Sequence, residues 1–192
     1  MNTLKRLAVA ITAATMLSTG AIATETFYKD EQGWFEIHGF VSGADGNPTC
    51  QIDAKYNDGS YFSLVKDMTD DEVWMELHNT VWKSLVIKRD ITISWAFHKK
   101  DGEAVYVQES NAGQIINVNT VQIRNLNPDG YNESMKTFIN LFQSSHAMSF
   151  QTDLENDGIQ NRIMWFRLPG SRKAINSVIN CVNVYKAATK LK

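Results

Sequence analysis

The dipeptide Asp-Gly occurs five times in this chain, and it constrains the fold more than any other feature. The pairs begin at Asp45, Asp58, Asp101, Asp129 and Asp157. Aspartate tolerates a left-handed backbone and glycine adopts one without steric cost, so the pair suits the tight turns that join antiparallel strands. The sequence therefore predicts a domain built largely from β-hairpins.

Runs of residues typical of strands lie between most of these turns. The predicted strands cover residues 34–41, 50–56, 61–66, 73–77, 81–87, 91–97, 104–109, 115–126, 148–154 and 163–168. The clearest is 91–97, in which every odd-numbered residue is a large apolar one. Residues 115–126 are compatible with one strand or two, because three asparagines interrupt them.

Two segments change to a helical period. In the first, Asn132 is a plausible N-cap, and the apolar residues at helical spacing are Tyr131, Met135, Phe138, Ile139 and Phe142. The second follows Pro169 and Gly170, with Ser171 as its expected cap and an apolar stripe over residues 174–185. Residues 186–192 are polar and basic and are predicted to fray.

The order of these elements is many strands, a helix, a hairpin and a final helix. Segregated elements of this kind indicate an α+β fold rather than alternating β-α-β units. We predict a predominantly antiparallel β domain, either a sandwich or a partly closed barrel-like sheet, with two α-helices of which the second is C-terminal. No repeat or linker divides residues 24–192, so they are expected to form one domain.

Residues 1–23 have the three regions of a secretory signal peptide. Lys5 and Arg6 form a basic head, residues 7–17 are uncharged and mostly apolar, and Ala21 and Ala23 supply a small-x-small cleavage pattern. We predict cleavage after Ala23 and a periplasmic or secreted protein of about 169 residues. An uncleaved membrane anchor is the alternative, although the apolar run is short for that role.

Charge and hydropathy limit the classes of partner that are expected for this chain. After residue 23 no apolar run approaches the roughly 20 residues that a membrane-spanning helix needs, so no integral membrane segment is expected. The formal charge of −2 becomes −4 when Lys5 and Arg6 are removed. Because no basic face is implied, nucleic acid is not an expected partner.

The chain has two cysteines, Cys50 and Cys181. An exported chain meets an oxidising compartment, where an even pair tends to form a disulfide. Such a bridge would join the C-terminal helix to an early strand. The alternative is two buried free thiols; a redox-active pair is not expected, because the Cys-x-x-Cys spacing is absent.

The residue types that can act in catalysis are not spaced as in any recognisable catalytic or metal-binding motif. The four histidines, His38, His78, His98 and His146, are not spaced as metal ligands relative to one another or to cysteine. His38 alternates with apolar neighbours and is compatible with a core position, whereas His98 is interpreted as a solvated side chain near a hairpin tip. No Gly-x-Ser-x-Gly motif is present. The sequence predicts no catalytic residue, no metal ligand and no cofactor.

Residues 153–158 place oxygen-bearing side chains at alternate positions before a glycine, as a calcium-binding loop does. The twelfth position of such a loop, where a glutamate would complete the site, is Met164. We therefore interpret this segment as the end of a strand followed by a hairpin turn.

An acidic cluster is the one candidate partner surface in the sequence. It consists of Asp67, Asp70, Asp71 and Glu72. Clustered carboxylates can act in acid–base chemistry or bind cations, and they can steer association with a basic partner. A solvated loop is the simpler interpretation.

Five tryptophans, Trp34, Trp74, Trp82, Trp95 and Trp165, are a second group with two interpretations. An exposed row of aromatic rings binds sugars or peptides. In a strand-rich domain such rings more often fill the core, which is the interpretation preferred here.

Several short motifs follow one another in an order that resembles known exported proteins. They are Cys50, Asn57-Asp58-Gly59-Ser60, Trp74-x-x-Leu77-x-Asn79-x-x-Trp82, Phe166-x-Leu168-x-Gly170-Ser171-x-x-Ala174 and Cys181. This layout resembles a group of small exported bacterial proteins with no assigned activity, and it is distantly similar to invasion-associated locus B type periplasmic proteins. The resemblance implies a β-rich exported domain with one disulfide, and it carries over no catalytic residue.

These observations favour a non-catalytic periplasmic or secreted binding or interaction domain. An inhibitor or immunity-type protein is included in this class, and the expected partner is an envelope or extracellular protein. The alternatives are an exported hydrolase, whose His, Asp, Glu or Ser side chains would converge in a cleft, and a structural or stress protein of the cell envelope.

Overall fold

The computed structural model describes residues 25–42, 46–57, 59–70, 72–80, 82, 85, 87–124, 126, 133–152 and 164–190. The predicted signal peptide and the calcium-like segment 153–158 lie outside these residues.

The described strands form one antiparallel sheet. They are β1 (Glu25–Gln32), β2 (Phe35–Val41), β3 (Pro48–Lys55), β4 (Tyr61–Asp67), β5 (Val73–His78), β6 (Asp90–His98), β7 (Ala104–Asn117), β8 (Thr120–Ile123), β9 (Ala147–Thr152) and β10 (Met164–Arg167). Their order in the sheet is β1-β2-β3-β4-β5-β8-β7-β6-β9-β10, and the sheet does not close on itself. Two helices accompany it, α1 (Glu133–Ser144) and α2 (Ser171–Thr189). The predicted α+β class, mostly β and with a C-terminal helix, is confirmed.

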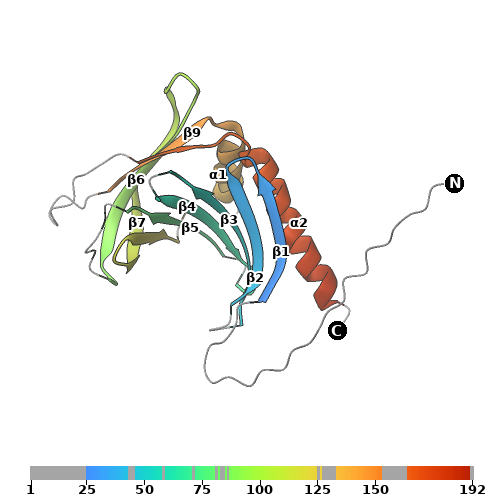
Figure 1. Cartoon of the computed structure of the whole chain (residues 1–192). Helices are drawn as coiled ribbons and strands as arrows, with labels where there is room; N and C mark the ends of the chain where they lie inside the picture. The colour runs from blue at the N-terminus through green and yellow to red at the C-terminus, as the bar shows by residue number, and fades with distance from the viewer. Residues whose placement is uncertain are drawn as a thin grey trace.

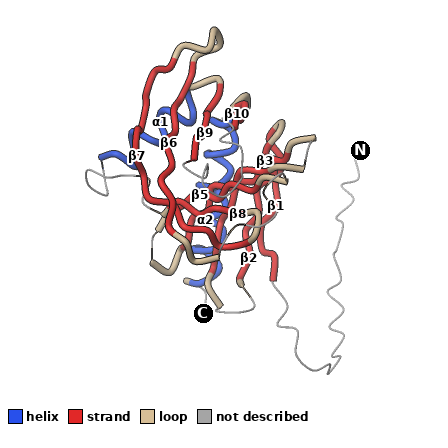
Figure 2. Tube along the Cα trace, turned by 90° about the vertical axis from the view of Figure 1, so that its left-hand side faces the viewer, coloured by secondary structure: helices blue, strands red, loops and turns tan. Residues whose placement is uncertain are grey.

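The sheet curls so that its two halves face each other across the core (Figures 1 and 2). The ring of Phe62 on β4 lies 6.2 Å from that of Phe150 on β9 and 5.7 Å from that of Phe166 on β10, measured between centroids. Helix α1 inserts into the same space, because Phe142 lies 5.7 Å from Phe62 and Phe138 lies 5.5 Å from Phe97. Aromatic packing therefore holds the curled sheet around α1.

Helix α2 packs on β1, β2, β3 and α1, along one end of the sheet (Figure 1). The predicted pairing of Cys50 with Cys181 is confirmed, since the two sulfurs are 2.00 Å apart and join β3 to α2. Gly39 of β2 pairs with Cys50 and makes this close approach feasible. A Cβ atom at Gly39 would lie 2.6 Å from the sulfur of Cys181 and 2.7 Å from the Cβ of Tyr28, both well inside contact distance.

Several predicted boundaries were wrong for physical reasons. Strand β1 was not predicted, because it is a mostly polar edge strand, and charged residues are common at sheet edges. Strand β7 is longer than predicted and turns directly into β8 at residues 118–119. Trp82 and Leu85 lie outside any strand, although their side chains are buried. Because these apolar residues belong to the core, this loop has an apolar pattern similar to that of a strand.

The start and the end of α2 also differ from the prediction. Ser171 does not cap the helix; Gly170, in a left-handed conformation, occupies that position, and its carbonyl accepts the hydrogen bond from the Ala174 amide. Ser171 is instead buried against the core. The residues expected to fray continue the helix as far as Thr189.

Among the Asp-Gly turns, the Asp101-Gly102 pair lies wholly in the described residues. It joins β6 to β7, and Gly102 has a φ of 90°, as predicted for a hairpin turn. The predicted hairpin pairings of β3 with β4, β6 with β7 and β9 with β10 are all confirmed.

Loss of the disulfide should reduce stability substantially. The bond spans 131 residues, and the chain-entropy model assigns a loop of this length about 5 kcal/mol as an upper figure. We expect Cys181→Ser to lower the melting temperature markedly, and reductant to lower that of the wild type to a similar value. Reductant should leave the variant unchanged. A wild-type melting temperature that does not change when reductant is added would contradict this prediction.

Gly39→Ala should destabilise the protein by about 2 kcal/mol, because its new methyl group meets a bonded sulfur and a backbone-linked Cβ that cannot move aside. Gly113→Ala is the comparison, since its added methyl group meets side-chain carbons of Ile93 and Val121 at 2.7 and 3.2 Å, and a terminal Cδ1 can shift more readily than a bonded sulfur, so the loss should be smaller. Urea unfolding of both variants gives the comparison. Equal losses in the two variants would show that the contact between β2 and α2 is not tight.

Candidate binding groove

Helix α2 covers only part of the core-facing side of the sheet. It packs on β1, β2 and β3, so its far flank faces the neighbouring strands β4 and β5. A groove with a volume of about 320 Å³ lies along this flank. This volume falls within the range of small-molecule sites, about 300–1,000 Å³.

Both walls of the groove are mainly aliphatic. From α2 they include Ile175, Val178, Ile179, Val182 and Asn183. From the opposite side they include Leu64 and Lys66 of β4, Val73 of β5 and Ile139 of α1.

The groove is continuous with the hydrophobic core but is not filled by it. Val73, Ile139 and Val178 are only partly buried, and each packs against the core cluster. Ile179 is 53% exposed, although it lines the groove. A contiguous apolar surface that remains accessible to solvent is typical of a binding site.

Lys66 is the only charged residue among the nine that line the groove. Phe62, Leu64 and Lys66 alternate along β4 and therefore share its core-facing side. Sequence analysis did not single out Lys66. The available signal was a lysine at a position where the alternation calls for an apolar residue.

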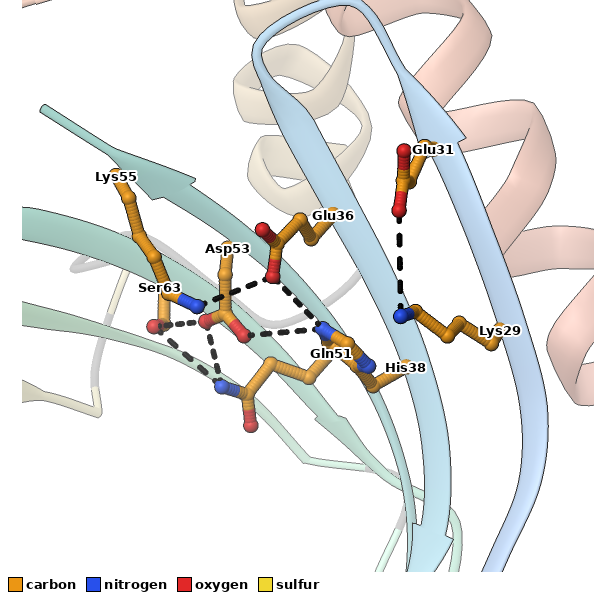
Figure 3. Close-up of polar contacts among 8 residues, drawn as sticks. All are labelled: Lys29, Glu31, Glu36, His38, Gln51, Asp53, Lys55 and Ser63. Atoms are coloured by element: carbon orange, nitrogen blue, oxygen red, sulfur yellow. Dashed lines mark hydrogen bonds and ion pairs between the residues drawn. The ribbon is translucent and has the colours of Figure 1, made fainter.

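A polar network covers the opposite face of β2, β3 and β4 (Figure 3). The carboxylate of Glu36 accepts a hydrogen bond from Lys55 at 3.0 Å and lies 3.4 Å from Nε2 of His38. Asp53 lies 3.9 Å from the same His38 nitrogen and accepts a hydrogen bond from Ser63 at 2.5 Å. The bond from Lys55 lowers the pKa of Glu36 and raises that of Lys55.

This network contains Ser, His and Asp but does not have the geometry of a nucleophilic triad. In a triad the serine donates its proton to the histidine, and the carboxylate holds the opposite ring nitrogen. Here the hydroxyl of Ser63 donates to Asp53, and its side chain is fully buried. The arrangement is that of cross-strand pairs that stabilise the outer face of the sheet.

The interpretation of His98 was wrong, and the core position open to His38 is not the one that the structure shows. His38 lies on the polar face, and 26% of its side chain is exposed. His98 is buried; it contacts the Gly102 carbonyl at 3.1 Å and the Ser149 hydroxyl at 2.8 Å. Strand β6 pairs with β9 as well as with β7, so its end is covered where a simple hairpin tip would be open.

The described residues of the predicted acidic surface differ in their surroundings. Asp67 is buried and accepts the amide hydrogen of Thr69, as a turn-forming aspartate does. Asp70 is exposed, and Asp71 lies outside the described residues. Glu72 is 2.8 Å from Arg124, which stacks over the ring of Trp74. The role of these four residues in binding stays a prediction.

The tryptophans divide between the two interpretations. Trp82 and Trp95 are buried, as expected for core residues. Trp74 is half-buried beneath Arg124. Trp34 and Trp165 are 59% and 51% exposed, so the core interpretation is wrong for these two. Trp34 lies in the β1–β2 turn and Trp165 on β10, where it contacts the ring of His98 at 4.3 Å between centroids.

Within the described residues, no group of three or more His, Cys, Asp or Glu side chains converges closely enough to hold a metal ion. Over the same residues, neither helix combines the length and hydropathy needed to cross a membrane. Comparisons with family models, curated proteins and solved structures found no match. The resemblance to invasion-associated locus B type proteins stays a prediction.

Hydrogen bonds to β1 fix the position of α2, and therefore of one wall of the groove. Ser177 of α2 is buried and donates a hydrogen bond to Asp30, while its oxygen lies 2.9 Å from the hydroxyl of Tyr28. The bond from Ser177, with smaller contributions from Gln32 and the Glu31 amide, lowers the pKa of Asp30.

This carboxylate should make stability depend on pH in a defined direction. Because folding lowers the pKa of Asp30, its contribution is present above the ordinary aspartate pKa of about 3.9 and is lost as pH falls through the folded value. We expect Asp30→Asn to lower the melting temperature at pH 7 and the difference from wild type to shrink below about pH 4.

Glu31→Gln provides the control, because Glu31 is exposed and lies 4.0 Å from an exposed lysine, Lys29. Its melting temperature should stay close to that of the wild type across the same pH range. A difference between Asp30→Asn and wild type that is constant from pH 7 to pH 3 would contradict the assignment.

Proposed function

We propose that this chain is an exported, non-catalytic binding domain that holds an apolar ligand in the groove between α2 and strands β4 and β5. The observation that carries the proposal is the groove itself, a space of about 320 Å³ with aliphatic walls that remains open beside a well-packed core. Apolar pockets that bear a few polar groups are the usual form of small-molecule sites.

Burial of aliphatic groups supplies the binding free energy in such a site. Each methylene removed from water contributes about 0.8 kcal/mol. The groove volume corresponds to roughly ten water-sized groups, taking about 30 Å³ for each. A ligand of that size would gain roughly 8 kcal/mol from burial, and the cost of association offsets at least about 4 kcal/mol of this gain.

Two features support export. The first 23 residues have the pattern of a signal peptide, and Cys50 and Cys181 form a bond that is typical of oxidising compartments. A periplasmic or secreted location follows from these features and belongs to the proposal.

A protein partner is the second candidate. It is favoured by Trp165, which is half-exposed on β10, the last described strand of the sheet order. Edge strands with exposed aromatic residues are frequent contact sites between proteins. In this alternative function, an envelope or extracellular protein would be the ligand, and the groove would remain empty.

A probe experiment tests the groove. The neutral dye N-phenyl-1-naphthylamine should bind the oxidised protein saturably, with one site per chain and an increase in fluorescence. Val182→Trp should weaken this binding at least tenfold, because Val182 lines the groove and a large ring would fill it.

Val184→Trp is the matched control. Val184 lies two residues further along α2, is 45% exposed and does not line the groove. Its affinity for the dye should equal that of the wild type, and thermal melting should show that both variants are folded. Absence of saturable dye binding to the wild type, or equal losses in the two variants, would overturn the proposal.

A further inference from the structure

The solvent-exposed face of helix α2 carries charge of one sign. Arg172, Lys173 and Lys186 of the helix and Lys190 at its C-terminal cap are all exposed, and residues 171–190 contain no Asp or Glu. The chain as a whole has a net charge of −2. The basic face is therefore a local feature of α2 and does not reflect the composition of the chain.

The carboxylates of β1, which packs against α2, do not neutralise this face. They are Glu25, Asp30 and Glu31. Asp30 accepts a hydrogen bond from Ser177 on the buried side of the helix, and Glu31 lies beside Lys29. Glu25 is exposed and forms no ion pair with another described residue.

The carboxylates on the far side of the groove are engaged with other groups. Asp67 is buried and accepts the amide hydrogen of Thr69, and Glu72 pairs with Arg124 at 2.8 Å. Within the part of the chain that the structure describes, no ion pair joins a carboxylate to any of the four cations of the basic face.

Two of the cations lie where they reduce the stability of the helix. Arg172 and Lys173 are in the first turn of α2, which contains no acidic residue. The helix dipole places a partial positive charge at this end, so acidic residues are stabilising there and basic residues are not. Fold stability therefore does not explain these two residues, whereas an anionic partner does.

The cations are spread along the helix, with aliphatic side chains between them. Helix α2 runs along the outside of the domain (Figure 1), and the distance from Arg172 to Lys190 is about 27 Å at 1.5 Å per residue. Ile179 and Val184 lie between the two basic ends and are 53% and 45% exposed. Basic residues combined with exposed aliphatic side chains are typical of helices that lie on anionic membranes.

The composition of this face favours lipid over the other classes of polyanion. Protein interfaces are depleted in lysine and enriched in aromatic residues, whereas the one aromatic residue of α2, Tyr185, packs against Phe27 of β1. Domains that bind nucleic acid are usually basic overall, and this chain is not.

We propose that the exposed face of α2 docks the exported domain on a bilayer that contains anionic phospholipids, with the helix axis parallel to the membrane surface. The lipid phosphates neutralise the cations at the two ends of the helix, and the aliphatic side chains between them enter the headgroup region. This inference goes beyond the groove and does not require a ligand in it.

Co-sedimentation with vesicles tests the proposal. The mature chain from Thr24 is used, because it contains all of the described structure and lacks the apolar residues 7–17. It should sediment with vesicles of equal parts phosphatidylglycerol and phosphatidylcholine and stay in solution with vesicles of phosphatidylcholine alone. Sodium chloride at about 1 M, where the screening length is about 3 Å, should release it.

Two double variants test the basic ends of α2 separately. Lys186→Gln with Lys190→Gln should weaken vesicle binding at least tenfold, because each cation near an anionic lipid surface strengthens binding about fivefold. Arg172→Gln with Lys173→Gln should weaken it similarly and should leave the melting temperature unchanged or higher, which a purely structural role would not do.

Lys99→Gln with Lys100→Gln is the matched control. Both lysines are exposed in the turn between β6 and β7, so this variant removes the same charge from another part of the surface. It should bind anionic vesicles as the wild type does.

The other outcomes overturn the proposal. They are equal sedimentation with both kinds of vesicle, and equal losses in the control and in the α2 variants. Binding to polyglutamate without sedimentation on anionic vesicles would assign the face to an acidic protein, which also overturns it. None of these outcomes depends on dye binding, so failure of this inference can be distinguished from failure of the groove.

Discussion

The covalent and steric contact between β2, β3 and α2 determines how the rest of the structure is arranged. Cys50 and Cys181 join the helix to β3, and Gly39 on the neighbouring strand leaves space for the sulfur atoms. A helix that approaches this closely cannot move across the sheet without clashing with the β1 residues beneath it. Ser177, buried against Tyr28 and Asp30, adds a polar contact that fixes its rotation.

The position of α2 explains why a groove exists at all. The helix is held over β1, β2 and β3, and the inward side of β4 and β5 continues beyond its flank. Helix α1 covers the middle of that side through Phe138 and Phe142, which pack into the curl of the sheet. The space between the two helices is therefore a consequence of where the disulfide holds α2.

Local pattern predicted the class of fold, both helices, the three hairpins and the partner of each cysteine, because these follow from short-range periodicity, turn residues and redox chemistry. It did not predict β1, whose edge position permits polar residues on both sides. It assigned His98 to solvent, and the structure shows this residue buried; His38, for which a core position was open, lies on the polar face with 26% of its side chain exposed. The burial of a strand end depends on which strands pair with it, and that is decided by residues distant in the sequence.

The groove could not be predicted from the sequence, for a similar reason. Its residues come from β4, β5, α1 and α2, and each taken alone is an ordinary amphipathic element. The stripe on α2 predicted a buried face correctly for Ala174 and Ile175, but the same stripe includes Ile179, which is half-exposed. The helical period shows which apolar residues share one face of a helix. It does not show whether another element covers that face.

The sizes of the side chains indicate that the groove results from the residues chosen to line it. Where the sheet curls over α1, the core is filled by large rings, namely Phe35, Phe62, Phe142, Phe150 and Phe166. Along the groove the chain places mainly valine, isoleucine and leucine, and these side chains leave a space of about 320 Å³ unfilled. Larger aliphatic or aromatic residues there would remove apolar surface from water and add stability. A sequence that fills one end of its core with rings and leaves the other end lined with branched aliphatic groups retains a space into which an apolar chain can fit.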